Sequence, residues 1–311
     1  MDKSREYGDL SIPFDDFLKE NPEPHWKRDV AEAIGTIYKD QGFIKLVQRR
    51  AKEGMIRISH GGDKIQWVNK DWQRSKISLE AGKREFLGLS LPFGAEKYIA
   101  TPEHSQIVVA GDVGSGKTHY GYHLADLNVG KIQIRHFVNE IGDSKAIRNL
   151  DDFPRLLEFF GKGYDLVNQD KEQLDVAENI DPKGLNIYDY LHLPSTKEWF
   201  LWLQKELARL SQKLETGVIV VMLQKKRGVG LAMGGDSTRM QCETYISLNV
   251  EKDVKGSDNE PGYKIGRVDI VKCKDWASNI NPETLSYRYR TAPKHGKLIP
   301  YGEGWFERNQ E

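Results

Sequence analysis

The sequence lacks the features that mark a secreted, membrane-bound or disulfide-stabilised protein. Its 311 residues include only two cysteines, Cys242 and Cys273, too few for a disulfide framework and without the paired spacing of a zinc site. No stretch approaches the roughly 20 consecutive apolar residues of a membrane-spanning helix, and residues 1–10 hold no signal-peptide core. We therefore expect a soluble protein of the reducing cytoplasm, with no membrane partner.

An excess of charge of either sign is also missing. The 46 basic residues equal the 46 acidic ones, which argues against a uniformly basic nucleic-acid-binding chain. Any nucleic-acid surface must then be a local patch. The length and the 38% of hydrophobic residues are sufficient for two domains, each with its own core.

Residues 1–76 predict a small α+β domain. Apolar residues recur at helical spacing in residues 25–37 and 43–52, and two alternating segments, residues 55–59 and 64–68, flank a turn. Helices followed by a hairpin predict a winged helix, with residues 43–52 as the recognition helix. Its cations Lys45, Arg49 and Arg50 are candidate DNA contacts, and docking of a protein by the same domain is the alternative.

Residues 77–311 predict an α/β domain with a mostly parallel sheet flanked by helices. From residue 106 onward, apolar strands alternate with amphipathic helices, which is the pattern of such a sheet. The strands are expected at residues 107–110, 132–138, 185–191 and 218–223.

A phosphate-binding loop stands between the first of these strands and the next helix. Its sequence GDVGSGKT comprises Gly111, Asp112, Val113, Gly114, Ser115, Gly116, Lys117 and Thr118. The glycines let backbone N–H groups approach phosphates, and the N-terminus of the helix adds positive potential. We expect Lys117 to reach the β- and γ-phosphates and Thr118 to ligate Mg²⁺.

Two acidic residues are candidates for the rest of the chemistry. Asp189 ends an apolar strand. We expect its carboxylate to bind Mg²⁺ in addition to Thr118. Glu140 follows the strand after the phosphate-loop helix and is expected to orient or deprotonate a water molecule. The alternatives are a surface Asp at a strand end and a Glu that caps a helix.

Together these segments resemble a known family. The phosphate loop, FVNE ending at Glu140, IYDYLHL around Asp189 and VIVVMLQ ending at Gln224 resemble the RecA-like ATPase core of DnaB-type replicative helicases, over about residues 77–290. The resemblance implies ATP with Mg²⁺, ATP hydrolysis that drives work on single-stranded DNA, and assembly of the chain with copies of itself into a ring or filament.

The resemblance also implies roles for further residues. Gln224 corresponds to the polar sensor of the γ-phosphate, and Lys272 with Lys274 to a basic pair that reaches the neighbouring subunit's nucleotide. The glycine-rich segment after Gln224 corresponds to a loop that holds single-stranded DNA, which makes Lys225, Lys226 and Arg227 candidate contacts. The alternative for both sets is an ordinary solvated basic segment.

The sequence also departs from that family. Lys274 stands where the family has Arg and lacks its planar pair of donors, and His192 stands where the family usually has Gln. A winged helix replaces the family's helical N-terminal domain, which favours a phage or mobile-element type of protein. An ATP-driven motor is therefore the leading hypothesis. An ATP-controlled DNA-binding switch or loader and a strand-annealing recombination protein stay open.

Overall fold

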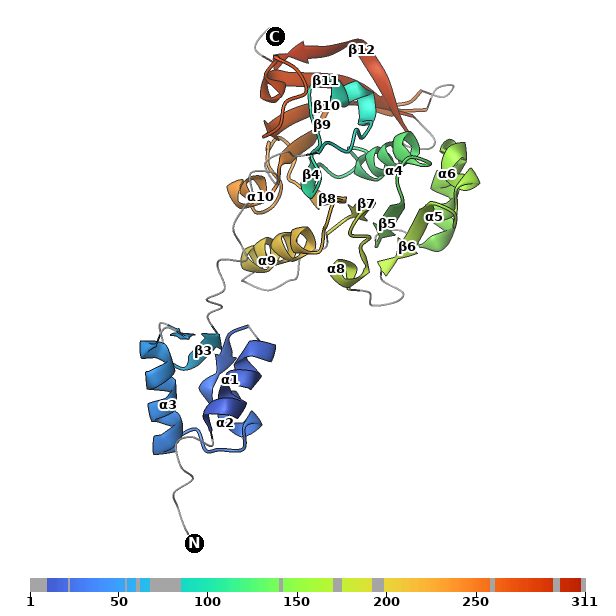
Figure 1. Cartoon of the computed structure of the whole chain (residues 1–311). Helices are drawn as coiled ribbons and strands as arrows, with labels where there is room; N and C mark the ends of the chain where they lie inside the picture. Colours follow the sequence, from blue (N-terminus) through green and yellow to red (C-terminus); the bar gives the residue numbers. More distant parts are fainter. Residues whose placement is uncertain are drawn as a thin grey trace. The chain divides into compact units, whose positions relative to one another are not determined.

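The structure is a computed structural model that describes residues 10–21, 23–53, 55–59, 62–67, 85–139, 142–169, 175–191, 199–257, 261–292 and 297–308. The chain divides into two compact units, Met1–Lys83 and Arg84–Glu311 (Figure 1). The boundary predicted after residue 76 lies outside the described residues. No helix of the described part is both long and apolar enough to cross a membrane.

The smaller unit combines helices with a short antiparallel sheet. Its elements are α1 Ser11–Glu20, β1 His25–Trp26, α2 Lys27–Ala33, α3 Gln41–Lys52, β2 Ile56–Ile58 and β3 Lys64–Trp67. The strands pair in the order β1-β3-β2. α3 begins after Asp40, whose carboxylate accepts hydrogen bonds from the N–H groups of Gly42 and Phe43. Phe14, Val30 and Phe43 bring the helices together in one core.

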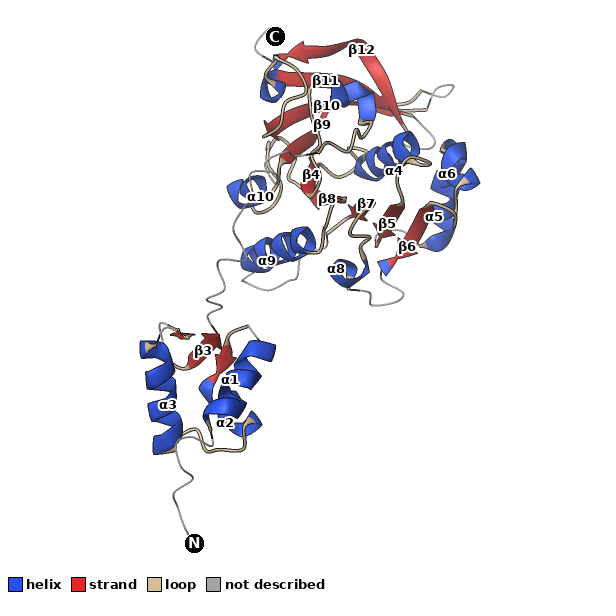
Figure 2. Ribbon diagram, in the orientation of Figure 1, coloured by secondary structure: helices blue, strands red, loops and turns tan. Residues whose placement is uncertain are grey.

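The larger unit is built on a sheet of nine described strands in the order β12-β11-β10-β9-β4-β8-β7-β5-β6. From β9 to β6 every neighbouring pair is parallel, and from β9 to β12 every pair is antiparallel (Figure 2). The parallel strands are β9 Thr244–Val254, β4 Ser105–Gly111, β8 Val218–Gln224, β7 Leu185–Asp189, β5 Ile134–Val138 and β6 Tyr164–Asn168. The antiparallel extension consists of β10 Tyr263–Cys273, β11 Leu285–Thr291 and β12 Leu298–Glu307. This arrangement confirms the predicted mostly parallel α/β sheet.

Helices cover both faces of the parallel strands, which explains why those strands are continuous apolar runs. On one face Ile107 and Val109 of β4 belong to the same core as Leu124 of α4 Lys117–Asn128. On the other face Val108 belongs to the same core as Leu207 of α9 Trp199–Gln212. The other α-helices among the described residues of this unit are α5 Asp143–Asn149, α6 Pro154–Glu158, α8 Val176–Asn179 and α10 Asp236–Gln241.

The strand β6 lies at the edge of the sheet and was absent from the strands expected from the sequence. Only its first residue, Tyr164, is buried, and the other residues of the strand are half-buried. Its sequence YDLVN mixes polar and apolar residues on both faces, so it has neither a continuous apolar run nor a clean alternation to mark it. It is recognised only by its pairing with β5.

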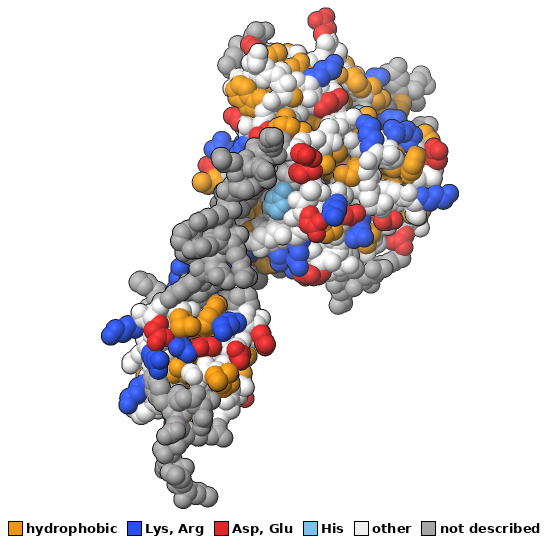
Figure 3. All heavy atoms as spheres, in the orientation of Figure 1, with side chains coloured by type: hydrophobic (Ala, Val, Ile, Leu, Met, Phe, Trp, Pro, Cys, Tyr) orange, Lys and Arg blue, Asp and Glu red, His pale blue; other side chains and the backbone are white. Residues whose placement is uncertain are grey.

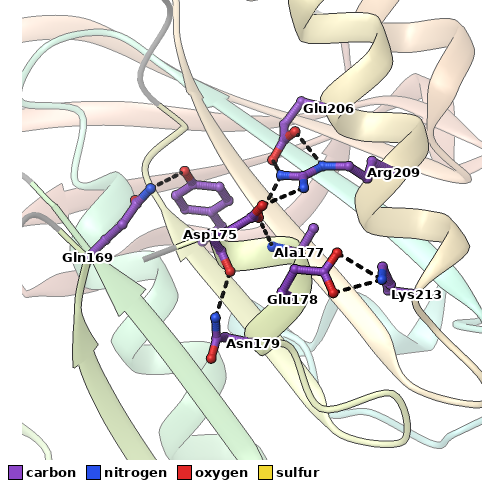
Figure 4. A network of polar contacts seen from close by, with 9 residues as sticks. Gln169, Asp175, Ala177, Glu178, Asn179, Glu206, Arg209 and Lys213 are labelled. Atoms are coloured by element: carbon purple, nitrogen blue, oxygen red, sulfur yellow. Dashed lines mark hydrogen bonds and ion pairs between the residues drawn. The ribbon is translucent and has the colours of Figure 1, made fainter. Parts of the chain in front are cut away.

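A network of ion pairs joins α8 and its N-cap residue to α9 and the residue that follows it (Figure 4). The two terminal nitrogens of Arg209 each lie 2.6 Å from an oxygen of Asp175, and Lys213 lies 2.8 Å from Glu178. Hydrogen bonding by Arg209 lowers the pKa of Asp175, which also accepts a hydrogen bond from the N–H of Ala177 at the start of α8. A helix as short as α8 is thus stabilised by its contacts with α9.

Candidate nucleotide-binding site

The loop between β4 and α4 has the geometry of a phosphate cradle. Gly114 and Gly116 have φ of 71° and 89°, a left-handed conformation that favours glycine. At Gly111 an added Cβ would lie 2.4 Å from Oγ of Ser115, so the loop closes too tightly for a side chain there. α4 begins at Lys117, and its first N–H groups have no partner within the helix. The loop therefore fits a nucleotide's phosphates by shape and by dipole.

The side chains of the loop supply a cation and two hydroxyl groups. Nζ of Lys117 donates to the carbonyl oxygens of Gly111 at 3.1 Å and Asp112 at 3.2 Å, so the ammonium bends back over the loop. Thr118 is half-buried in the first turn of α4. Within the described residues, the buried Oγ of Ser115 has no hydrogen-bond partner. These polar atoms suit a nucleotide bound with Mg²⁺.

Two further predicted residues stand at the same edge of the sheet as the loop. Gln224 ends β8 in register with Gly111, and Asp189 ends β7, the next strand. Parallel strands present their carboxyl ends at one edge, so both residues lie on the side of the sheet where the phosphate loop begins. Asp189 is only 4% exposed, and its charge adds to burial in raising the pKa of Tyr122.

Asn139 holds the backbone that follows Asp189. Its side chain donates to the carbonyl oxygen of Tyr190 at 2.6 Å and accepts from the N–H of Tyr190 at 3.2 Å. Its own N–H donates to the carbonyl oxygen of Asp189 at 3.3 Å. The ends of β5 and β7 are thereby joined next to the predicted metal ligand. Glu140, the predicted water-orienting residue, and His192 lie outside the described residues.

Lys225 occupies a buried position that the sequence did not predict. Its Nζ lies 3.7 Å from the carboxylate of Asp112 and donates to the carbonyl oxygen of Val229 at 2.8 Å and to Oγ of Ser247 at 2.9 Å. A further bond joins Nζ to Oδ1 of Asn249. Burial lowers the pKa of Lys225, while Asp112 opposes the shift. The enclosed ammonium presents no surface to a DNA backbone, so contact of Lys225 with nucleic acid would require the side chain to leave these partners.

The other two cations of that segment are exposed. Lys226 faces solvent, and Arg227 forms a pair with Asp253 at 3.1 Å in which both side chains stay largely exposed. The loop that follows returns to the sheet edge, where the N–H of Met233 donates to the carbonyl oxygen of Gln224 at 3.2 Å. Lys226 and Arg227 thus lie in a loop that begins after Gln224, the candidate γ-phosphate sensor, and returns to it.

The basic pair at the end of β10 is engaged within its own chain. Nζ of Lys272 donates to the carbonyl oxygens of Arg239 and Cys242, both at 2.6 Å, and thereby satisfies acceptors at the end of α10. Lys274 forms a 3.3 Å ion pair with Glu243. Contact with a neighbouring subunit's nucleotide would require both side chains to give up these partners.

The antiparallel strands bring two residues to the loop that sequence reasoning missed. Oη of Tyr289 on β11 donates to the carbonyl oxygen of Ser115 at 2.6 Å. On β10, Nζ of Lys264 comes so near the loop that a Cβ added to Gly114 would lie 2.4 Å from it. No local pattern marks either residue, since their position depends on the order of strands in the sheet.

In the smaller unit, one predicted DNA contact has a structural role. Arg50 and Asp15 form a pair whose side chains are each 13% exposed, and Nε of Arg50 donates to Asp15 at 2.9 Å. The bond to Asp15 raises the pKa of Arg50. Its guanidinium joins α3 to α1, so contact of Arg50 with DNA would require the side chain to leave Asp15. Lys45 and Arg49 are exposed.

Comparisons with known proteins bear on the larger unit. No protein family model matches the sequence, and no curated protein matches it. Among solved structures, the chain is similar to a KaiC-like protein of the archaeon Pyrococcus horikoshii OT3, with a TM-score of 0.52 and 15% identity over 70% of this chain and 100% of that one. The larger unit has a RecA-like fold.

The predicted fold class is confirmed by this similarity, which at 15% identity concerns the fold alone. A RadB recombinase is also similar, with a TM-score of 0.44 and 12% identity over 64% of this chain and 92% of that one.

Proposed function

We propose that the chain is a Mg²⁺-dependent ATPase of the RecA-like type. The observation that carries this proposal is the phosphate loop at the sheet edge, with Gln224 in register with Gly111 and Asp189 at the end of the next strand. In this proposal Lys117 binds the β- and γ-phosphates, and Thr118 and Asp189 hold the metal ion. Bound Mg²⁺ would neutralise charge on the phosphate oxygens.

The remaining residues of the proposed site act on water and on the γ-phosphate. Glu140 orients the attacking water and accepts its proton, and Gln224 contacts the γ-phosphate and responds to its loss. Lys264 adds positive potential beside Gly114. Tyr289 keeps the loop in shape through its bond to the backbone of Ser115.

We propose single-stranded DNA as the partner on which ATP hydrolysis acts, with the chain assembled as a ring or filament. The exposed Lys226 and Arg227 support this, since they lie in the loop that begins after Gln224 and are placed to couple backbone contacts to the γ-phosphate. The element order of the smaller unit supports the proposal that it is a winged-helix-like domain. Its exposed Lys45 and Arg49 are then candidate contacts for the DNA backbone.

A second candidate function is an ATP-controlled DNA-binding switch or loader. The observation that favours it is the engagement of Lys272 with carbonyl oxygens of its own chain and of Lys274 with Glu243. Hydrolysis would then be slow and would reset an assembled state instead of driving movement. Lys274 in place of Arg points the same way, because Lys lacks a two-pronged donor set.

The deciding experiment measures ATP hydrolysis without nucleic acid, with single-stranded DNA and with duplex DNA. Lys117→Ala should lower hydrolysis at least about a hundredfold, because it removes the cation on the transferred phosphoryl group. Glu140→Gln should abolish hydrolysis and keep ATP binding. Lys162→Ala, at an exposed turn before β6, is the matched control and should leave the rate unchanged.

Each outcome selects between the proposals. Equal hydrolysis by the wild type and by folded Lys117→Ala protein would rule out an ATPase at this loop. Stimulation by single-stranded DNA together with strand separation supports a motor. Hydrolysis that is indifferent to DNA supports the switch, and annealing of strands without unwinding supports a recombination protein.

A further inference from the structure

The smaller unit contains a groove beside α3 that takes no part in the proposed ATPase site. Its volume is about 450 Å³, and its lining includes Lys27, Lys39, Tyr38, Phe43, Ile44 and Val47. Clefts of roughly 300–1,000 Å³ are typical of binding sites. The groove therefore has room for several side chains of a partner.

The groove is apolar at its base and partly exposed at its edge. Phe43 and Val47 are 1% and 3% exposed and belong to the core of the unit, whereas Ile44 and Tyr38 each keep 37% of their surface exposed. Ile37, next to Tyr38 in the chain, is 74% exposed. Single exposed apolar residues are common, but apolar residues grouped around a concave surface mark an interaction site.

The groove and the cations of α3 occupy different sides of that helix. Ile44, Val47 and Gln48 are spaced three or four residues apart, so they share one side of the helix, and all three line the groove. Lys45, Arg49 and Lys52 have the same spacing and share a different side, which does not line the groove. Lys and Arg side chains gather over the α3 side of the unit in the view of Figure 3. A DNA backbone held by Lys45 and Arg49 would consequently leave the apolar groove uncovered.

The charge of the lining points to the chemistry of the occupant. Lys27 and Lys39 line the groove, and among the described residues that line it there is no Asp or Glu. Positive groups around an apolar surface attract an apolar partner that carries negative charge. A phosphate backbone would satisfy the lysines but would leave the exposed apolar surface of Ile44 and Tyr38 without apolar contacts.

We propose that this groove binds a short amphipathic helix of a partner protein with acidic residues beside its apolar face. Apolar side chains at positions i, i+3, i+4 and i+7 of that helix enter the groove against Ile44 and Val47, as helices do in other apolar grooves. Its carboxylates pair with Lys27 and Lys39. The smaller unit then selects a protein partner, and this role is independent of the ATPase activity.

The test uses the full-length protein with labelled isoleucine methyl groups and NMR titration. The probe is a synthetic helical peptide with leucines at i, i+3, i+4 and i+7 and glutamates beside them. The comparison peptide has lysines in place of the glutamates, and a short DNA duplex is titrated separately. The acidic peptide should shift the methyl resonances of Ile44 and Ile58, which line the groove, and leave the buried core residue Ile65 unshifted.

Variants separate binding from folding. Lys27→Glu combined with Lys39→Glu should weaken peptide binding roughly fivefold or more, because it reverses the charge of both rim residues. Lys45→Glu, on the other side of α3, is the matched control and should change the affinity less than about twofold. An unchanged Ile65 resonance verifies that each variant is folded.

Three results would overturn the proposal. One is the absence of any shift at Ile44 and Ile58 with the acidic peptide. Another is an equal shift with the lysine peptide, which would show that Lys27 and Lys39 do not select an acidic partner. The third is a shift of these methyl groups by duplex DNA alone, which would assign the groove to nucleic acid.

Discussion

The ammonium of Lys225 lies 3.7 Å from the carboxylate of Asp112, and the two side chains are 0% and 4% exposed. Asp112 also accepts a hydrogen bond from the N–H of Val250 at 3.1 Å, and Lys225 donates to the carbonyl oxygen of Val229. This pair therefore connects the phosphate loop with β9 and with the loop that carries Lys226 and Arg227. The phosphate loop and the segment proposed to hold DNA are thus joined by one buried ion pair.

Lys225→Met should lower the free energy of unfolding by about 3 kcal/mol, because it leaves the buried carboxylate of Asp112 without its cation. Lys226→Met, at the exposed neighbouring position, should change it by less than about 0.5 kcal/mol. Urea denaturation measures both. Adding Asp112→Asn to Lys225→Met should restore part of the loss, since the buried charge is then gone. Equal stability of the Lys225 and Lys226 variants would contradict the structural role of the pair.

Tyr289→Phe should weaken ATP binding about fivefold, because one hydrogen bond of about 1 kcal/mol to the phosphate loop is lost. Tyr287→Phe is the matched control, since Tyr287 lies on the same strand and stacks on Phe93 at a centroid distance of 4.6 Å. Titration with a fluorescent ATP analogue measures both affinities. If the two variants bind equally well, the bond from Tyr289 to Ser115 does not support the loop.

His136 should make the larger unit sensitive to acid. It is fully buried, with Nδ1 3.0 Å from the hydroxyl of Tyr164, and burial lowers its pKa from 6.5 to about 3. Below pH 6.5 the unfolded chain takes up a proton that the folded chain excludes, so stability is full above that pH and falls as the pH drops toward 3. The expected slope is about 1.4 kcal/mol per pH unit from this residue.

The measurement is the free energy of unfolding from urea titrations between neutral and acidic pH. His136→Gln, which has no titrating group, should show a smaller slope over this range than the wild type. The same slope in both proteins would show that His136 does not contribute to acid sensitivity.

Arg50→Ala should destabilise the smaller unit by about 3 kcal/mol, because the largely buried Asp15 loses its partner. Arg49→Ala should cost less than about 1 kcal/mol, since its pair with Glu53 is exposed. Hydrogen exchange of the α1 amides reports the stability of this unit in the full chain. Loss of DNA binding by an Arg50→Ala protein of unchanged stability would support the DNA-contact role and contradict the structural one.

Much of the fold and the centre of the site were predictable because their signals are local. The phosphate loop is a run of consecutive residues whose glycines and lysine are defined by spacing alone. The apolar runs that became β4, β7 and β8 are continuous because helices cover both faces of those strands, and Asp189 and Gln224 were recognisable as polar residues at strand ends. The edge strand β6 was not predicted, because only one of its residues is buried.

The sequence by itself determined the phosphate loop, the alternation of strands and helices, and the hairpin of the smaller unit. Only the tertiary structure decided which lysine and arginine side chains are exposed to solvent. Lys225 and Arg50 stand in basic runs that predict exposure, yet each is enclosed with a carboxylate from a distant segment, Asp112 and Asp15. The partner of a charged side chain depends on which elements pack together, and a lysine or arginine carries no local mark of that packing. Tyr289 could not be predicted for the same reason, because it contacts the loop only through the antiparallel strands that extend the sheet beyond β9.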